Sequence, residues 1–168
     1  MRGHIVPHWT SQQISCIDYA KQENIYRGFQ SVDAGYKELA VSMDIHQGLH
    51  PVFDSLELDD YFSWLESKMY AIHCMHPGCA LPEHSDKYPY YTRTHGVTDI
   101  DNIQRIIVFL EDKQPGHRFT LEGIDVEHWR AGDWISWNGA ATHGAYNEGI
   151  VKRYTLQITG LIRVLNPT

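Results

Sequence analysis

The first 70 residues contain two stretches whose apolar positions favour helices, Ser11–Gln22 and Asp54–Tyr70. The apolar positions of the second stretch recur at helical spacing and are Leu58, Tyr61, Phe62 and Leu65. Asp54, with Glu57 three residues later, is typical of the capped start of a helix. We therefore expect residues 1–68 to form a helical N-terminal part.

The pattern changes from about residue 69, where short runs of β-branched and aromatic residues alternate with turn sequences. The clearest runs are Arg105–Leu110, His117–Leu121, Asp133–Trp137 and Val151–Thr159. The turns between them are rich in Gly, Pro, Asn and Asp. This spacing predicts an antiparallel double sheet on which the N-terminal helices pack, with the functional site within residues 69–168.

Composition fits a single folded domain covering residues 1–168. Hydrophobic residues make up 42% of the chain and charged residues 21%, values within the range of ordinary globular proteins. The three cysteines match no zinc or disulfide spacing and favour free thiols in a reducing compartment. No stretch resembles a signal peptide or is long enough to span a bilayer. We expect a cytoplasmic protein without membrane contact.

Net charge bears on the partners of the protein. The formal charge of −7 opposes sequence-independent binding to phosphate backbones, which relies on clustered Lys and Arg. Nucleic acid is therefore a disfavoured partner, and a small molecule or a peptide is the expected one. The eleven histidines point to a different chemistry, because imidazole is the commonest metal ligand among side chains.

One histidine belongs to the sequence His84-Ser85-Asp86, which comes after Pro82 in a segment that we interpret as extended. Residues two apart in a strand share a face, so the imidazole and the carboxylate point in the same direction. His143, on a distant strand, would complete a site of two histidines and one carboxylate, which suits ferrous iron with open positions. Chance alone gives close to one His-x-Asp in such a chain, so the motif gains its weight from the residues downstream of it.

Arg153 and Thr155 lie beyond the turn after His143, two residues apart and so on one face of a strand. A guanidinium binds a carboxylate through two parallel hydrogen bonds, and a neighbouring hydroxyl adds a third donor. The pair is therefore a candidate carboxylate clamp. The alternative is a surface arginine on an edge strand.

In this order, His84, Asp86, His143 and Arg153 resemble the motif of the 2-oxoglutarate and iron(II) dependent dioxygenases. Further landmarks are similar to the prolyl-hydroxylase branch of that superfamily. They are Pro77-Gly78, the strand Arg105–Leu110, Gly116, the segment Trp129–Trp134 and the closing Arg153–Leu156. The resemblance covers about half of the chain and implies a double-stranded β-helix, the cupin-like jelly roll.

The resemblance also implies roles for these residues. His84, Asp86 and His143 would bind Fe(II), and Arg153 with the help of Thr155 would bind the distal carboxylate of the co-substrate 2-oxoglutarate. Met75 stands where prolyl hydroxylases commonly place a tyrosine that contacts the co-substrate. Arg105 could contact 2-oxoglutarate instead, as a similarly placed arginine does in the aspartyl/asparaginyl hydroxylase branch, or it could face solvent.

The implied reaction uses O2 to hydroxylate an aliphatic C–H bond, with release of succinate and CO2. The prolyl-hydroxylase resemblance favours an amino-acid or peptidyl side chain as substrate. The aromatic segment from Tyr88 to Asp101 would then form a loop over the mouth of the site. Two other interpretations are a cupin-like metal-binding barrel without oxygenase activity, and a non-catalytic interaction protein that binds no iron.

Overall fold

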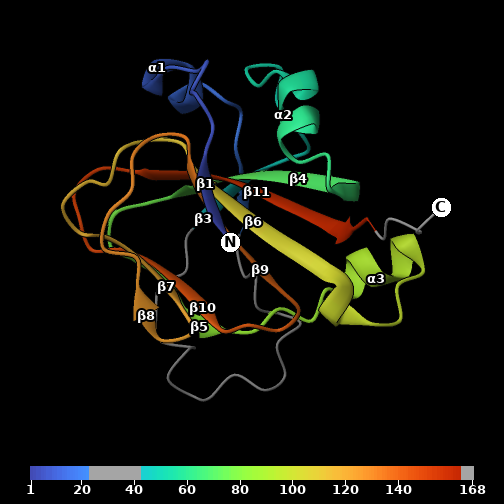
Figure 1. Cartoon of the computed structure of the whole chain (residues 1–168). Coiled ribbons are helices and arrows are strands. Elements are labelled where there is room, and N and C mark those ends of the chain that lie inside the picture. The colour runs from blue at the N-terminus through green and yellow to red at the C-terminus, as the bar shows by residue number, and fades with distance from the viewer. Residues whose placement is uncertain (23–42, 164–168) are drawn as a thin grey trace.

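The computed structural model describes residues 1–22 and 43–163, which form two antiparallel β-sheets (Figure 1). The larger sheet contains β1 (Arg2–His4), β2 (Ala20–Gln22), β3 (Met43–Gln47), β4 (Leu65–Met75), β6 (Ile103–Phe109), β9 (Asp133–Asn138) and β11 (Arg153–Ile162). The smaller sheet contains β5 (Cys79–His84), β7 (His117–Leu121), β8 (Ile124–Asp125) and β10 (His143–Asn147). Their orders are β1-β9-β6-β11-β4-β3-β2 and β5-β10-β7-β8.

The eight strands from β4 to β11 form a double-stranded β-helix. Along the chain they pass from one sheet to the other at every connection except the one between β7 and β8. Each sheet thereby receives four of them, as in a jelly roll. The predicted fold class, mainly β with a jelly-roll core, is confirmed, and each of the four predicted strands is present.

The N-terminal part is less helical than the sequence pattern predicts. Helix α1 covers only Ser11–Ser15, and the end of the first predicted helix is the strand β2. Helix α2 covers only Ser55–Tyr61, and from Leu65 the chain is already the strand β4. β4 pairs with β11 from Leu65 to Met75, and this pairing outweighs the helical spacing of the side chains. The predicted helical part of residues 1–68 is therefore wrong in extent.

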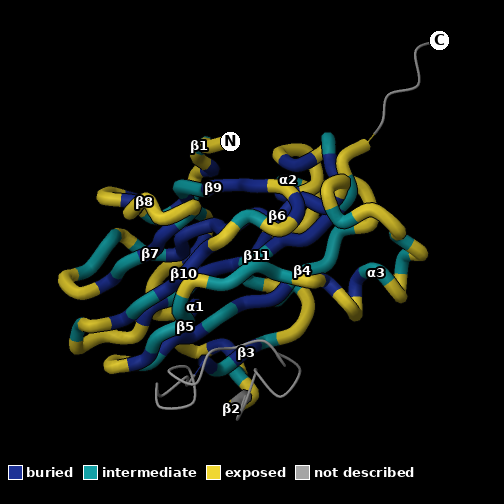
Figure 2. The backbone as a smooth tube through the Cα atoms, turned by 90° about the horizontal axis from the view of Figure 1, so that it is seen from below, coloured by how far each residue is buried: buried dark blue, intermediate teal, exposed yellow. Residues whose placement is uncertain are grey.

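Two apolar cores lie on opposite faces of the larger sheet. Helices α1 and α2 lie on one side of this sheet and the smaller sheet on the other (Figure 1), and its central strands contain buried stretches, dark blue in Figure 2. The outer core packs α1 and α2 on the sheet, as predicted, and includes Ile14, Leu58, Phe62, Leu156 and Ile158. The inner core fills the space between the sheets and includes Met75, Ile107, Phe109, Phe119 and Trp137. Because residues alternate along a strand, the other face of β11 points between the sheets. It carries Arg153, Thr155, Gln157 and Thr159.

Among the described residues, no helix has both the length and the apolar character that crossing a membrane requires. All three cysteines are free thiols, as predicted, with Cys16 exposed and Cys74 and Cys79 buried.

Candidate metal centre

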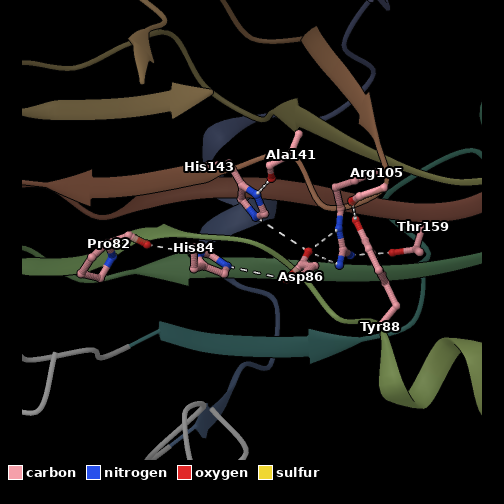
Figure 3. A network of polar contacts seen from close by, with 9 residues as sticks. Pro82, His84, Asp86, Tyr88, Arg105, Ala141, His143 and Thr159 are labelled. Atoms are coloured by element: carbon pink, nitrogen blue, oxygen red, sulfur yellow. Dashed lines mark hydrogen bonds and ion pairs between the residues drawn. The ribbon is translucent and has the colours of Figure 1, made fainter. Parts of the chain in front are cut away.

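The structure brings His84, Asp86 and His143 together at one end of the smaller sheet. His84 is the last residue of β5 and His143 the first of β10, and the two are direct partners in the sheet. Asp86 lies two residues beyond β5 and turns its carboxylate towards both rings (Figure 3). One ligand atom from each residue lies within 4.8 Å of the others. The triad predicted from the sequence is thus assembled in space.

Backbone carbonyls fix how the two imidazoles are presented. Nδ1 of His84 lies 2.9 Å from the carbonyl oxygen of Pro82, and Nδ1 of His143 lies 3.0 Å from that of Ala141. A carbonyl only accepts, so each Nδ1 carries the proton and donates it. The Nε2 atoms are left to face Asp86. A ligand histidine is normally oriented by such a hydrogen bond from its other ring nitrogen.

The spacing of the donor atoms fits one ion. Nε2 of His84 lies 3.6 Å from Oδ1 of Asp86, and Nε2 of His143 lies 3.7 Å from Oδ2. Neighbouring ligand atoms at about 2.1 Å from one metal are about 3.4 Å apart in a tetrahedral and about 3.0 Å apart in an octahedral arrangement, so these atoms need to approach one another by roughly 0.2 to 0.7 Å on an ion. Two nitrogens and one carboxylate leave further positions open to a substrate, as is typical of non-haem iron sites.

The protonation states also suit a metal. Burial lowers the pKa of His143 to about 4, so its ring is neutral near pH 7. Burial acts to raise the pKa of Asp86, but Arg105 and the two histidines together hold it well below its ordinary range. Metal binding needs a neutral imidazole and an ionised carboxylate, and no proton must be removed from either group first.

Arg105 is a partner of the triad. It is 8% exposed, which excludes the solvent-facing alternative. Its Nε and Nη2 donate to Oδ2 of Asp86 at 3.1 and 2.5 Å, and its Nη1 donates to the hydroxyl of Thr159 at 2.5 Å (Figure 3). The ring of Tyr88 covers the guanidinium at 4.9 Å. The structure therefore pairs Arg105 with a candidate metal ligand, and its predicted contact with 2-oxoglutarate stays a prediction.

Arg153 and Thr155 both lie between the sheets, at 4% and 5% exposure, so Arg153 is not a surface residue. Nε and Nη2 of Arg153 are buried and have no hydrogen-bond partner among the described residues. Three rings surround the guanidinium at 5.6 to 6.0 Å, those of Phe109, Phe119 and Trp129. Burial lowers the pKa of Arg153 to about 10, which leaves it a cation. Donors that remain unpaired in an apolar enclosure are suited to an anion from solution.

His73 belongs to the same interior, although the sequence pattern does not place it there. It pairs with Thr155 in the sheet, and its neighbours on the same face, Ala71 and Met75, belong to the inner core. Burial, with Arg105 and Arg153 adding to it, lowers the pKa of His73 to about 3. A neutral imidazole therefore lies within reach of the charges of both arginines. The alternation of β4 could have revealed its face once the strand itself had been predicted.

A cavity of about 250 Å³ opens beside Asp86 and Arg105. Its walls come from β3, β4, β6 and β11 and from the segment after Asp86. Tyr88, Tyr90 and Tyr91 line it, in agreement with the predicted covering of the site, but this segment contains the helix α3 (Pro89–His95) and the short 3-10 helix η2 (Ile100–Asn102) where a loop was expected.

No protein-family model matches the chain, and no curated protein does. Among solved structures, a Pseudomonas putida prolyl-4-hydroxylase is 16% identical with a TM-score of 0.49, over 77% of this chain and 80% of its own. A predicted oxalate decarboxylase from Thermotoga maritima is 15% identical with a TM-score of 0.49, over 88% of this chain and 95% of its own.

A putative sugar phosphate isomerase from Acidithiobacillus ferrooxidans is 15% identical with a TM-score of 0.48, over 93% of this chain and 74% of its own. Proteins with such different described activities cannot assign one of them to this chain. The fold rests on the strand order, and the class that fold and site define is a jelly-roll protein with a candidate metal centre.

Proposed function

We propose that this protein is an Fe(II) and 2-oxoglutarate dependent dioxygenase that hydroxylates an aliphatic C–H bond of an amino acid or a peptidyl side chain. The proposal rests on one observation, which is that a candidate metal triad and a buried unpaired arginine lie inside the same barrel. A triad of His84, Asp86 and His143 suits iron, and a buried Arg153 offers unpaired donors to an anion. A protein that only binds a metal has no need of the second feature.

Each residue of the site would have its own task. His84, Asp86 and His143 would hold the iron, while Arg153 and Thr155 would bind the distal carboxylate of 2-oxoglutarate. With O2, iron and 2-oxoglutarate supply the oxidising chemistry, and succinate and CO2 are the co-products. The aromatic rings around Arg153 exclude water from the ion pair, which strengthens it. Arg105 holds one oxygen of Asp86 and so orients the carboxylate.

The remaining features of the proposal concern partners and location. We propose a small-molecule or peptide substrate, no nucleic acid and a cytoplasmic location, in keeping with the acidic chain and its free thiols. The competing function is a cupin-like metal-binding barrel without oxygenase activity. It predicts metal binding without any response to 2-oxoglutarate, and Arg153 is the residue that separates the two functions.

The test measures succinate release from 2-oxoglutarate by the Fe(II)-loaded protein, together with metal affinity by calorimetry. Asp86→Asn should abolish turnover and weaken metal binding by roughly tenfold to hundredfold or more, because it removes the anionic ligand. Asp44→Asn is the matched control, since Oδ2 of Asp44 lies 2.7 Å from Nε2 of His76 in a similar carboxylate–histidine contact outside the triad. Metal binding without any 2-oxoglutarate turnover, even with a broad set of substrates, would favour the competing function.

A further inference from the structure

We propose that the 250 Å³ cavity beside Asp86 binds a free carboxylic acid of about ten non-hydrogen atoms as the molecule to be oxidised. The inference rests on the proposed function and deepens it, because it names the substrate class. It selects a small acid over a side chain presented by a polypeptide.

The position of the cavity separates it from the proposed co-substrate site. It reaches Gln157 and Thr159 on β11, whereas Arg153 is the first residue of the same strand. Steps of four and six residues along a strand span roughly 13 and 20 Å. Asp86 lines the cavity itself, so a molecule bound there contacts the triad directly. Two organic molecules can therefore approach the metal from different ends of the barrel.

The volume of the cavity limits what it can hold. An engineered protein cavity of about 150 Å³ encloses benzene, so 250 Å³ is enough for roughly ten non-hydrogen atoms. That is the size of a free amino acid or a small hydroxy acid. A polypeptide would need an extended groove leading to the cavity in addition to this volume.

The walls show which groups recognise the ligand. The hydroxyls of Tyr88 and Tyr91 donate to the carbonyl oxygens of Gly139 and Ser67, at 3.0 and 2.9 Å. Their hydroxyl groups are therefore occupied by hydrogen bonds within the fold, and mainly their rings remain to contact a ligand. The polar groups left for a ligand belong to Gln47, Lys87, Tyr90 and Gln157. None of these four side chains has a hydrogen bond or an ion pair within the described residues.

The charges on the walls favour an anion. Arg105 and Asp86 neutralise one another through their ion pair, which leaves Lys87 as the one unbalanced charge among the lining residues. A carboxylate bound by Lys87 and an amide of Gln157 would satisfy this charge. A residue within a peptide has no α-carboxylate to offer, and a free acid does.

The experiment measures binding to the zinc-loaded protein in the absence of 2-oxoglutarate. The probes are the twenty free L-amino acids, malate and citrate, the carboxamides of the amino acids, and N-acetylated amino-acid amides that represent peptide residues. Binding is measured by calorimetry. We expect at least one free acid to bind and its carboxamide to bind roughly tenfold to hundredfold more weakly, the loss that one charge-assisted contact implies.

Two variants locate the binding site. Lys87→Gln should weaken binding of that acid by a similar factor. Lys152→Gln should leave it unchanged, because this exposed lysine lies beside Arg153 at the other end of β11. The inference is overturned if no acid of the panel binds, if the N-acetylated amide binds as tightly as the acid, or if both variants behave alike.

This test does not depend on turnover, so the two proposals fail separately. If an acid binds but no succinate is released, the dioxygenase proposal is wrong and the cavity is still a binding site for a carboxylic acid. If succinate is released but no acid binds, only the inference about the substrate class is wrong.

Discussion

Replacing Arg153 by methionine should stabilise the fold and at the same time abolish the binding of 2-oxoglutarate. Its guanidinium is buried, and Nε and Nη2 have no hydrogen-bond partner among the described residues. Burial lowers the pKa of Arg153 from 12.5 to about 10. The group is protonated at pH 7 in both the folded and the unfolded chain, so the whole difference counts against folding. At about 1.4 kcal/mol per pKa unit, it amounts to roughly 3 kcal/mol.

Methionine fills similar space without a charge, and it adapts to an aromatic enclosure. Part of the gain is offset, because Glu111 loses a nearby cation. We therefore expect the free energy of unfolding to rise by about 2 kcal/mol, with an increase in Tm of roughly 5 °C. In the zinc-loaded wild-type protein, 2-oxoglutarate should raise stability, since a ligand that binds only the folded state stabilises it. The variant should show no such response.

The assay is urea unfolding monitored by tryptophan fluorescence, with Zn²⁺ in place of Fe²⁺ and with or without 2-oxoglutarate. Lys152→Met is the matched control, because it removes a positive charge from the exposed neighbour of Arg153. A methionine variant that is less stable than the wild type would show that Arg153 is satisfied within the fold. Equal stabilisation of both proteins by 2-oxoglutarate would show that the anion binds elsewhere.

Three further changes test the physical account of the fold and the site. Burial raises the pKa of Glu111 from 4.5 to about 7, so stability should decline as pH rises from about 4.5 to 7, and Glu111→Gln should flatten this decline in unfolding curves measured across that range. Arg105→Leu leaves Asp86 without its cation and should cost about 3 kcal/mol in urea unfolding, of which added Zn²⁺ restores part by supplying positive charge. Gly132→Ala should cost about 2 kcal/mol or more in thermal unfolding, because Gly132 has φ +88° and an added Cβ would collide with the carbonyl oxygen of Ile5. Unchanged stability in either of these last two variants would contradict the contacts described.

The strands and the His84–Asp86 part of the triad could be predicted because both depend on short-range rules, whereas His143 was found through its place in the family motif. The boundaries of His117–Leu121 are the same in the prediction and in the structure, since turn residues mark both ends of that strand. His84 and Asp86 converge because they are two residues apart at a strand end, and His143 joins them through sheet pairing. The sequence order of the jelly roll is enough to make that pairing foreseeable.

Other features depend on pairing that no local pattern contains. Leu65 continues the helical apolar spacing that begins at Leu58, yet from Leu65 onward the chain forms β4, because β11 and β3 lie on its two sides. The contact of Arg105 with Asp86 joins β6 to the segment after β5. The local sequence around either residue does not indicate that the two will meet. His73 was missed for the first of these reasons, since its face is defined only once β4 is known to be a strand.

The two buried arginines show why burial alone does not identify a ligand site. Arg105 and Arg153 both lie on the inner face of the larger sheet at similarly low exposure. Arg105 has a carboxylate and a hydroxyl within the fold, so its charge is compensated and its removal destabilises the protein. Arg153 has aromatic rings around it and unpaired donors, and Glu111 offsets only part of the cost, so its charge costs stability that an added anion can return. Opposite signs of the stability change for Arg105→Leu and Arg153→Met are therefore the sharpest expectation that the structure supports, and equal signs would mean that the two arginines serve the same role.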